Sequence, residues 1–273
     1  MKTKFNLVGN SFTHLTGGHT GYSVHGKVSK YIEWVQDGTG VSTFYVDFTI
    51  PQALIDNVGG VKYAWLLESN HVIDQIVNEI KMFPEKYLEM FDMIFTHNQE
   101  LLKIDPKFKW VPANGFWIKD AKIYPKTKLI SFITSNKNFT EGHKKRLEWV
   151  QRIGDQVDLY GRGFNEIATK EEGLCDYMFS VAIENGFYES YFTEKILDCF
   201  ATGTIPVYLG SPDIGDYFNK DGIINLSEEF DISEEMYYSK MNAIVENLEK
   251  VKSMEVLEDF IYKNYFRGNV KDD

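Results

Sequence analysis

The chain has 273 residues, of which 43% are hydrophobic, and it carries a formal net charge of −11 at pH 7. This length fits one or two domains with a sizeable core. The acidic balance argues against nucleic acid or an anionic membrane as the main partner, because both require a basic surface. The two cysteines, Cys175 and Cys199, lack the spacing of zinc ligands and indicate buried thiols of a reducing compartment.

The amino-terminal segment lacks the apolar stretch of a signal peptide, and no run of about 18 apolar residues occurs along the chain. We therefore expect a cytoplasmic protein with no transmembrane segment. Peripheral attachment to a membrane and derivation from a longer protein both stay open.

In the first half, short runs rich in β-branched and aromatic residues alternate with helical spacing. The predicted helical segments are 72–82 and the turn 87–90, and the predicted strands are 4–8, 43–50, 61–67, 93–96 and 109–111. The stretch 120–128 is polar, contains Pro125 and has no periodicity, so it is interpreted as a domain linker. The expected domains are residues 1–122 and 123–273.

The second half repeats this alternation. Helices are predicted after Asn136, at 193–201 and over most of 236–262, and strands at 129–134, 156–160, 178–183 and 204–209. The pattern predicts an α/β protein with two units and largely parallel sheets, whose last helix could pack back on the first unit. Ligands bind such sheets at the carboxyl ends of the strands.

The segment 179–226 contains a buried strand, a polar-aromatic loop, a helix that begins at T-E-K, and a second buried strand. Thr193 can cap this helix, whose free N–H groups attract an anion. Lys195 lies in the first turn, where it could reach a phosphate, although a solvated lysine paired with an acid fits the pattern equally well. Glu194 could accept hydrogen bonds from ribose or sugar hydroxyls, or simply favour the helix start.

The loop before that helix carries further candidates. Asn185 follows a strand and could contact a ligand or serve as a turn residue. Tyr188 and Tyr191 could stack on a base, donate to a phosphate, or pack across the loop. Upstream, a second strand ends at Ser135-Asn136, and the helix after it carries a basic cluster. Arg146 is the candidate phosphate ligand there, because a guanidinium can bind phosphate oxygens in a bidentate way; an exposed basic face is the alternative.

Glu68 follows the apolar run 64–67 and is the candidate general base, since partial desolvation makes a carboxylate a better proton acceptor. A hydrogen-bonded surface acid is the alternative. His97 follows another predicted strand and is a rival base. Further rivals lie in the glycine-rich stretch near the amino terminus: His14, His19 and His25. The D-x-D pair that many metal-dependent sugar transferases use is absent from the chain.

Three short sequence segments resemble the motif of a known protein family. I-E-N at 183–185, Y-F-T-E-K-I at 191–196 and G-T-I-P-V-Y-L-G-S-P at 203–212 resemble, in residue type and spacing, the donor-binding motif of the α1,3-fucosyltransferase family. The pair Ser135-Asn136 with Arg146 is similar to an upstream element of that family, with a few extra residues between them. Glu68 with Asn70 resembles a short segment that carries the proposed base.

The resemblance implies two Rossmann-like domains of the GT-B type, with an active site in the cleft between them. The second domain would bind GDP-fucose and the first an oligosaccharide or glycoconjugate acceptor. The implied reaction inverts the anomeric centre without a metal or other cofactor. Glu68 would accept the hydroxyl proton. The donor contacts would come from residues of the upstream element and of the donor-binding motif: Arg146, Asn185, Tyr188, Tyr191, Thr193, Glu194 and Lys195.

Four hypotheses follow from these residues. The chain is a fucosyltransferase that uses GDP-fucose and forms an α1,3 linkage, a related GT-B transferase that uses another nucleotide sugar, a binding protein for nucleotide sugars or glycans that lacks catalysis, or an α/β interaction domain.

Overall fold

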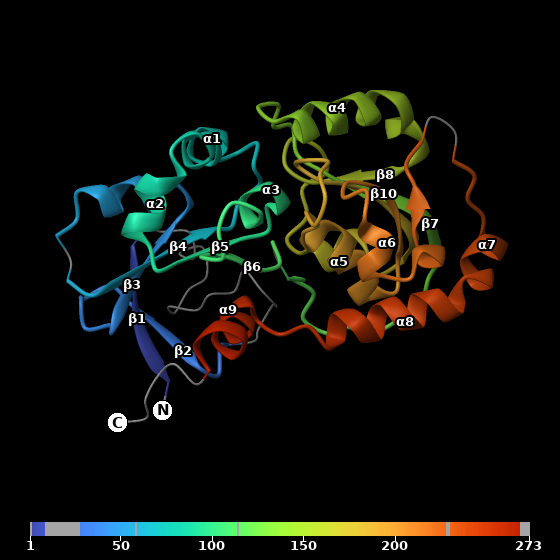
Figure 1. The fold of residues 1–273 in the computed structure, drawn as a ribbon. Coiled ribbons are helices and arrows are strands. Elements are labelled where there is room, and N and C mark those ends of the chain that lie inside the picture. Colours follow the sequence, from blue (N-terminus) through green and yellow to red (C-terminus); the bar gives the residue numbers. More distant parts are fainter. Residues whose placement is uncertain (1, 9–27, 58, 114, 228–229, 268–273) are drawn as a thin grey trace. The chain divides into compact units, whose positions relative to one another are not determined.

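The computed structural model describes residues 2–8, 28–57, 59–113, 115–227 and 230–267. The chain divides into two compact units, which Figure 1 shows in sequence colours. The first unit consists of Met1–Gly115 and Glu255–Asp273, and the second of Phe116–Met254. The division after Gly115 precedes the expected boundary at 122–123, so the predicted linker falls within the second unit.

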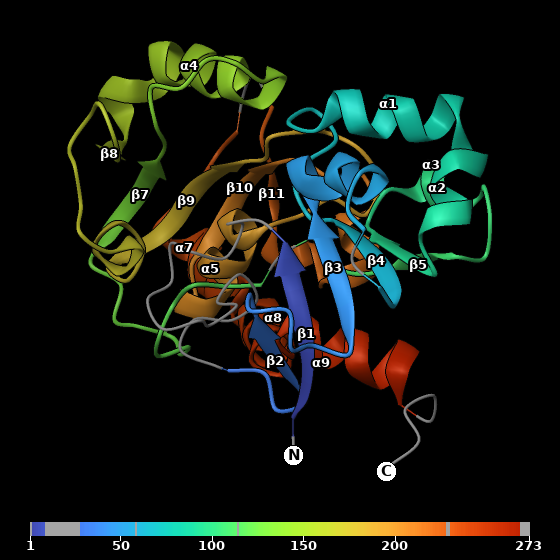
Figure 2. The ribbon, with the colours of Figure 1, turned by 90° about the vertical axis from the view of Figure 1, so that its left-hand side faces the viewer.

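The first unit contains, among its described residues, a six-stranded sheet whose strands all run parallel. Figure 2 shows β1, β3 and β4 pointing the same way. The order is β2-β1-β3-β4-β5-β6, with β1 Thr3–Val8, β2 Ile32–Val35, β3 Ser42–Val46, β4 Val61–Leu66, β5 Met93–Thr96 and β6 Phe108–Trp110. The sequence predicted each of these strands except β2.

Both faces of this sheet are buried, which explains why its strands are apolar runs. In β4, Tyr63 and Trp65 pack on one face and Ala64 and Leu66 on the other. The helical elements of this unit are η1 Asp47–Leu54, α1 Asp74–Met82, α2 Pro84–Met90, α3 Gln99–Leu102, α9 Leu257–Ile261 and the π-helical turn Tyr262–Phe266. Residues of α1 and α2 join the Ala64 core, and those of α9 join the Trp65 core.

The predicted strand 43–50 is wrong beyond Val46. Asp47 has φ 47°, a left-handed conformation that a strand cannot contain. Its side chain accepts hydrogen bonds from the backbone of Leu67 and Glu68, and the chain turns into the 3₁₀ helix η1. The aromatic pattern of the segment favoured a strand, whereas this long-range contact determines where the strand ends.

The second unit contains, over its described residues, a five-stranded parallel sheet in the order β11-β10-β9-β7-β8. The strands are β7 Lys128–Ile133, β8 Asp158–Tyr160, β9 Tyr177–Ile183, β10 Ile205–Leu209 and β11 Ile224–Asn225. The connections leave β7 on one side to β8 and then return to β9 on the other. Ligands bind α/β sheets at such a reversal, outside the carboxyl ends of the strands.

The helical elements of the second unit are α4 Glu141–Ile153, η2 Gly154–Gln156, η3 Lys170–Gly173, α5 Glu194–Thr202, α6 Ile214–Tyr217, η4 Lys220–Gly222, α7 Glu234–Ser239 and α8 Met241–Lys252. Gly203 follows α5 in the left-handed conformation that favours glycine. The predicted helical run 236–262 is interrupted after Lys252, and α9 belongs to the first unit.

The sequence predicted an irregular segment at 120–128, and the structure is irregular over 120–127, whereas Lys128 already begins β7. This segment is held by the second unit. The Lys126 ammonium donates hydrogen bonds of 2.9 Å to the carbonyls of Cys175 and Thr202. The backbone N–H of Lys122 donates to the carbonyl of Ala201.

Among the described helices, none is both long and apolar enough to cross a membrane.

Candidate active site

A cavity of about 250 Å³ opens at the carboxyl ends of β7 and β9 in the second unit. This is the point where the strand order reverses, so the fold alone places a ligand site here. The strand ends contribute Thr134 and Ile183, and the charged residues of its lining are Arg146, Lys170, Glu194, Lys195 and Asp198.

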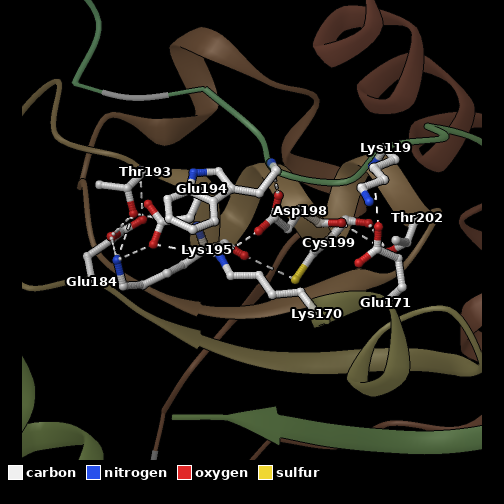
Figure 3. Close-up of polar contacts among 11 residues, drawn as sticks. Lys119, Lys170, Glu171, Glu184, Thr193, Glu194, Lys195, Asp198, Cys199 and Thr202 are labelled. Carbon is white, nitrogen blue, oxygen red and sulfur yellow. Dashed lines mark hydrogen bonds and ion pairs between the residues drawn. The ribbon is translucent and has the colours of Figure 1, made fainter. Parts of the chain in front are cut away.

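Carboxylates and ammonium groups alternate along this cavity (Figure 3). Lys195 Nζ lies 3.4 Å from Glu184 Oε2 and 3.2 Å from Glu194 Oε1. Lys170 Nζ lies 3.8 Å from Glu194 Oε1 and 2.6 Å from Asp198 Oδ2. Each lysine thus joins two carboxylates, and together with Arg146 the row contains three positive and three negative groups.

Glu184 anchors the start of α5. Its side chain is fully buried, and it accepts hydrogen bonds from Thr193 N at 2.9 Å and from Thr193 Oγ1 at 2.7 Å. Thr193 caps α5, as predicted, and its Oγ1 also accepts from Lys195 Nζ at 2.9 Å. The buried carboxylate therefore fixes the helix start and the ammonium group together. Glu184 belongs to the I-E-N string, but no pattern in the sequence indicates a role for it.

Glu194 lies between the two lysines at the cavity. Burial opposes its ionisation, yet the adjacent Lys195 and Lys170 lower its pKa to about 2. The carboxylate is therefore ionised at neutral pH and acts as a hydrogen-bond acceptor. Such a group is suited to bind vicinal hydroxyls of a ribose or a hexose.

Arg146 lies on the buried face of α4. The predicted basic cluster is divided by helical spacing, because His143 and Arg146 are buried whereas Lys144 and Lys145 are exposed. Arg146 Nη2 donates to Asn185 Oδ1. Within the described part of the chain, Arg146 Nε and the cavity-lining Thr134 Oγ1 are buried without a hydrogen-bond partner. An anion in the cavity could satisfy such donors.

Gly142 allows α4 to approach the end of β9. A Cβ atom at this position would lie 2.1 Å from the carbonyl oxygen of Glu184 and 2.6 Å from Asn185 Cα. Gly142→Ala is therefore expected to lower the free energy of unfolding by about 2–3 kcal/mol, because backbone atoms must shift. Urea denaturation measures the effect. Gly154→Ala is the control, since its Cβ would meet only Val150 Cγ1 at 3.7 Å; equal stability of the two variants would contradict the close approach.

The two tyrosine candidates occupy a different position from the charged row. Tyr188 and Tyr191 stack on each other with ring centroids 4.8 Å apart, and Tyr191 is buried. Neither ring belongs to the cavity lining, nor does Asn185, which contacts Arg146 instead. Of the predicted donor residues, the cavity brings together Arg146, Glu194 and Lys195.

The structure adds residues that the sequence did not indicate. Lys170 follows a polar segment without a recognisable signal, and Asp198 looked like one polar residue of an amphipathic helix. Its spacing of four residues from Glu194 was the available signal, because it places both carboxylates on one helix face. Groups of His, Cys, Asp or Glu that could hold a metal ion are absent from the described residues.

Glu68 belongs to the first unit, where it follows β4 and is partly exposed. Its backbone N–H donates to Asp47 Oδ1 at 3.1 Å, as does that of Leu67 at 2.8 Å. The rival His97 is buried, and burial lowers its pKa to about 3, so its ring is neutral at physiological pH. The rivals His14, His19 and His25 lie outside the described residues.

Asp47 is a buried carboxylate whose charge destabilises the folded state. Burial, together with the nearby Glu68 carboxylate, raises its pKa to about 7. Between pH 4 and pH 7 the unfolded chain has lost this proton and the folded chain retains it, so stability falls as pH rises. Asp47→Asn keeps the oxygen that accepts both N–H bonds, and at pH 8 it is expected to raise the free energy of unfolding by about 2–4 kcal/mol.

Urea denaturation between pH 4.5 and pH 8 checks this expectation. The difference between Asp47→Asn and the unmodified protein should shrink as the pH falls through this interval. Asp92→Asn, which changes an exposed acid of the same unit, serves as the control. A difference that is independent of pH would refute the assigned charge state of Asp47.

Comparison with known proteins agrees with the motif in the second unit. Residues 123–267 match the family described as "Glycosyltransferase family 10 (fucosyltransferase) C-term". The chain belongs to this family. The resemblance that the three strings carry is thereby confirmed at the level of the fucosyltransferase family.

Two curated relatives of this family 10 chain match parts of it. The alpha-(1,3)-fucosyltransferase FucT of Helicobacter pylori is 36% identical over 78 residues, which are 29% of this chain and 16% of the relative. The 4-galactosyl-N-acetylglucosaminide 3-alpha-L-fucosyltransferase 9 of Bos taurus is 24% identical over 159 residues, which are 55% of this chain and 43% of the relative. The family 10 chain thus spans less than half the length of these relatives.

Solved structures share the fold of this chain at low sequence identity. A crystal structure of an alpha1,3-fucosyltransferase superimposes with a TM-score of 0.56 at 16% identity, covering 97% of this chain and 88% of the other. A structure of an alpha1,3-fucosyltransferase with GDP-fucose gives a TM-score of 0.51, again at 16% identity, with 90% and 81% covered. The predicted GT-B-type α/β fold with two parallel sheets is confirmed.

Proposed function

We propose that this family 10 protein transfers fucose from GDP-fucose to a hydroxyl group of a glycan, with inversion at the anomeric carbon and formation of an α1,3 linkage. The observation that carries the proposal is the cavity of the second unit, where Arg146, Glu194 and Lys195 meet within the segment that defines the family. A structure of the same fold has been determined with GDP-fucose, which supports this choice of donor.

The charged row suits a leaving diphosphate. Lys195 and Arg146 would neutralise the negative charge that develops as the sugar–phosphate bond breaks, and the N–H groups at the start of α5 would add to this. Glu194 would accept hydrogen bonds from ribose hydroxyls. Asn185 would hold the Arg146 guanidinium in place, and Tyr191 with Thr193 would shape the loop and the helix start around the donor.

In the proposed reaction, the acceptor oxygen forms a bond to the anomeric carbon from the face opposite the phosphate. The bond between this carbon and the phosphate oxygen breaks, and its electron pair leaves with GDP. Glu68 accepts the proton of the acceptor hydroxyl. Because protein cations neutralise the diphosphate in this scheme, we propose that the reaction needs no metal ion.

Calorimetry with GDP, UDP and the corresponding nucleotide sugars tests the donor, and a transfer assay with GDP-fucose and β-galactosyl-N-acetylglucosamine acceptors tests the reaction. We expect GDP and GDP-fucose to bind, and transfer to persist in excess EDTA. Binding of UDP in place of GDP would identify a transferase with another donor. Binding of GDP-fucose without transfer to any glycan would indicate a binding protein, and loss of transfer in EDTA would refute metal independence.

A further inference from the structure

The charged row continues past the residues that the proposed function uses. Asp198 is buried, with 1% of its side chain exposed, and it accepts hydrogen bonds from Trp117 N at 2.5 Å and from Lys170 Nζ at 2.6 Å. The Lys170 ammonium also lies 4.9 Å from the centre of the Trp117 ring. Both Lys170, whose side chain is 29% exposed, and Asp198 line the cavity, so this ion pair faces the same space as Lys195 and Glu194.

The charged groups beside α5 follow one another in the same order as the phosphates, ribose and base of a nucleoside diphosphate. Glu194 and Asp198 are four residues apart, so they lie on one face of the helix about one turn from each other. Lys170 joins the two carboxylates, while Lys195 lies on the other side of Glu194 (Figure 3). A diphosphate at Lys195 and a ribose at Glu194 therefore direct the base towards Lys170 and Asp198.

The lining of the cavity near this pair suits a flat aromatic ring. The walls of the cavity include apolar side chains from β7, β9, α5 and the residue that follows η3: Ile133, Val181, Cys199 and Leu174. Binding sites for small molecules typically combine such walls with a few fixed polar groups that determine orientation. The ion pair of Lys170 with the buried Asp198 supplies those polar groups.

We propose that Lys170 and Asp198 form the base-recognition site and select guanine, the 6-oxo-2-amino purine, by its hydrogen-bonding edge. The proposal rests on the proposed function, in which a nucleoside diphosphate occupies the cavity. Guanine presents the O6 acceptor beside the N1–H and N2–H donors. The Lys170 ammonium donates to O6, and the Asp198 carboxylate accepts from N1–H and N2–H.

Both side chains retain the hydrogen-bonding capacity that this contact requires. Asp198 Oδ1 accepts from Trp117 N and Oδ2 from Lys170 Nζ, each oxygen can accept a further hydrogen bond, and an ammonium group has three donors. The backbone N–H of Trp117 fixes the carboxylate before the base arrives, so little ordering is needed on binding. A base with the wrong edge places a donor against the Lys170 ammonium or an acceptor against the buried Asp198 carboxylate, and this mismatch is the source of discrimination.

The hydrogen-bonding edges of other purines do not match the groups of Lys170 and Asp198. Adenine presents an amino donor at the position of O6, where it would face the Lys170 ammonium. Hypoxanthine lacks the 2-amino group that donates to Asp198. Xanthine has an acceptor at that position, which would face the carboxylate.

A series of nucleoside diphosphates measured by calorimetry on the unmodified full chain gives the first test. GDP is expected to bind about tenfold more tightly than IDP, the factor typical of one hydrogen bond to a charged group. XDP and ADP are expected to bind at least about a hundredfold more weakly than GDP, because buried donors or acceptors face like groups. Similar affinities for GDP, IDP and XDP would overturn the proposal.

Exchange of the carboxylate gives the second test. In Asp198→Asn the amide oxygen can still accept from N1–H, while the amide N–H can donate to the 2-oxo group of xanthine. The variant is expected to lose about tenfold or more in GDP affinity and to gain XDP affinity, so the GDP-to-XDP preference reverses. Asp155→Asn changes an exposed acid of the same unit and should leave both affinities unchanged.

Lys170→Met provides an independent variant in case the exchange of buried Asp198 prevents folding, which circular dichroism reports. It removes the donor to O6 and should reduce the GDP-to-ADP preference. An equal loss of GDP, XDP and ADP affinity in both variants would show that the pair merely supports Glu194, and would overturn the proposal. Binding and transfer of GDP-fucose without base selectivity would refute this inference alone, whereas failure of every nucleoside diphosphate to bind would refute the proposed function as well.

Discussion

Glu68→Gln is expected to lower kcat for fucose transfer by about 10²–10⁴-fold, the range for loss of a general base. The amide has nearly the same shape as the carboxylate but cannot accept the proton of the acceptor hydroxyl. GDP affinity should stay within about twofold, because Glu68 belongs to the first unit and the charged row belongs to the second. Steady-state kinetics with GDP-fucose and calorimetry with GDP measure the two quantities separately.

Glu89→Gln is the matched control for this prediction, since Glu89 is an exposed acid of the same unit. The backbone bond from Glu68 to Asp47 does not involve the exchanged group, and loss of the Glu68 charge relieves its repulsion with Asp47, so stability should not fall. Full turnover by Glu68→Gln would refute its role as the base. The candidates would then be His97 and the three histidines near the amino terminus, of which buried His97 is the least suited because its pKa is about 3.

The second unit could be predicted from sequence to a large extent, because its signals are local. Apolar runs bounded by polar residues predicted β7, β9 and β10 within a residue or two, and the Thr193 cap predicted the start of α5. The choice of Lys195 and Glu194 also followed from local order, since both occupy the first turn of a helix after a buried strand. Their presence at one cavity agrees with that choice.

The contacts that could not be predicted join residues distant in sequence. Lys170 and Asp198 meet because η3 packs on β7 while α5 packs on the neighbouring β9, and no spacing along the chain reports this. The Asp47 side chain accepts a hydrogen bond from Leu67 N, which lies 20 residues further along the chain. The left-handed backbone of Asp47 ends β3 before the end of the predicted strand. The division after Gly115 differs from the expected boundary at 122–123 for the same reason. The segment that follows is held in the second unit by hydrogen bonds from Lys126 to residues distant in sequence.

Lys195→Ala is expected to weaken GDP binding by about 10–100-fold and GMP binding much less. A charge-assisted hydrogen bond to a phosphate contributes about 1.5–3 kcal/mol, and the proposed partner of Lys195 is the diphosphate. Removal of the ammonium also leaves Glu184 and Glu194 without their shared cation, which adds repulsion against the incoming anion. Calorimetry with both nucleotides measures the ratio of their affinities.

Lys145→Ala is the matched control, because Lys145 is an exposed lysine on α4 that pairs with Glu148 and does not line the cavity. Its loss should leave both nucleotide affinities unchanged, which separates the local effect of Lys195 from the general charge of this acidic protein. Glu184 stays bonded to Thr193 in Lys195→Ala, so the start of α5 should be retained. If Lys195→Ala weakened GDP and GMP equally, the ammonium would act on the α-phosphate or the ribose, and the assignment of the diphosphate to Lys195 would be wrong.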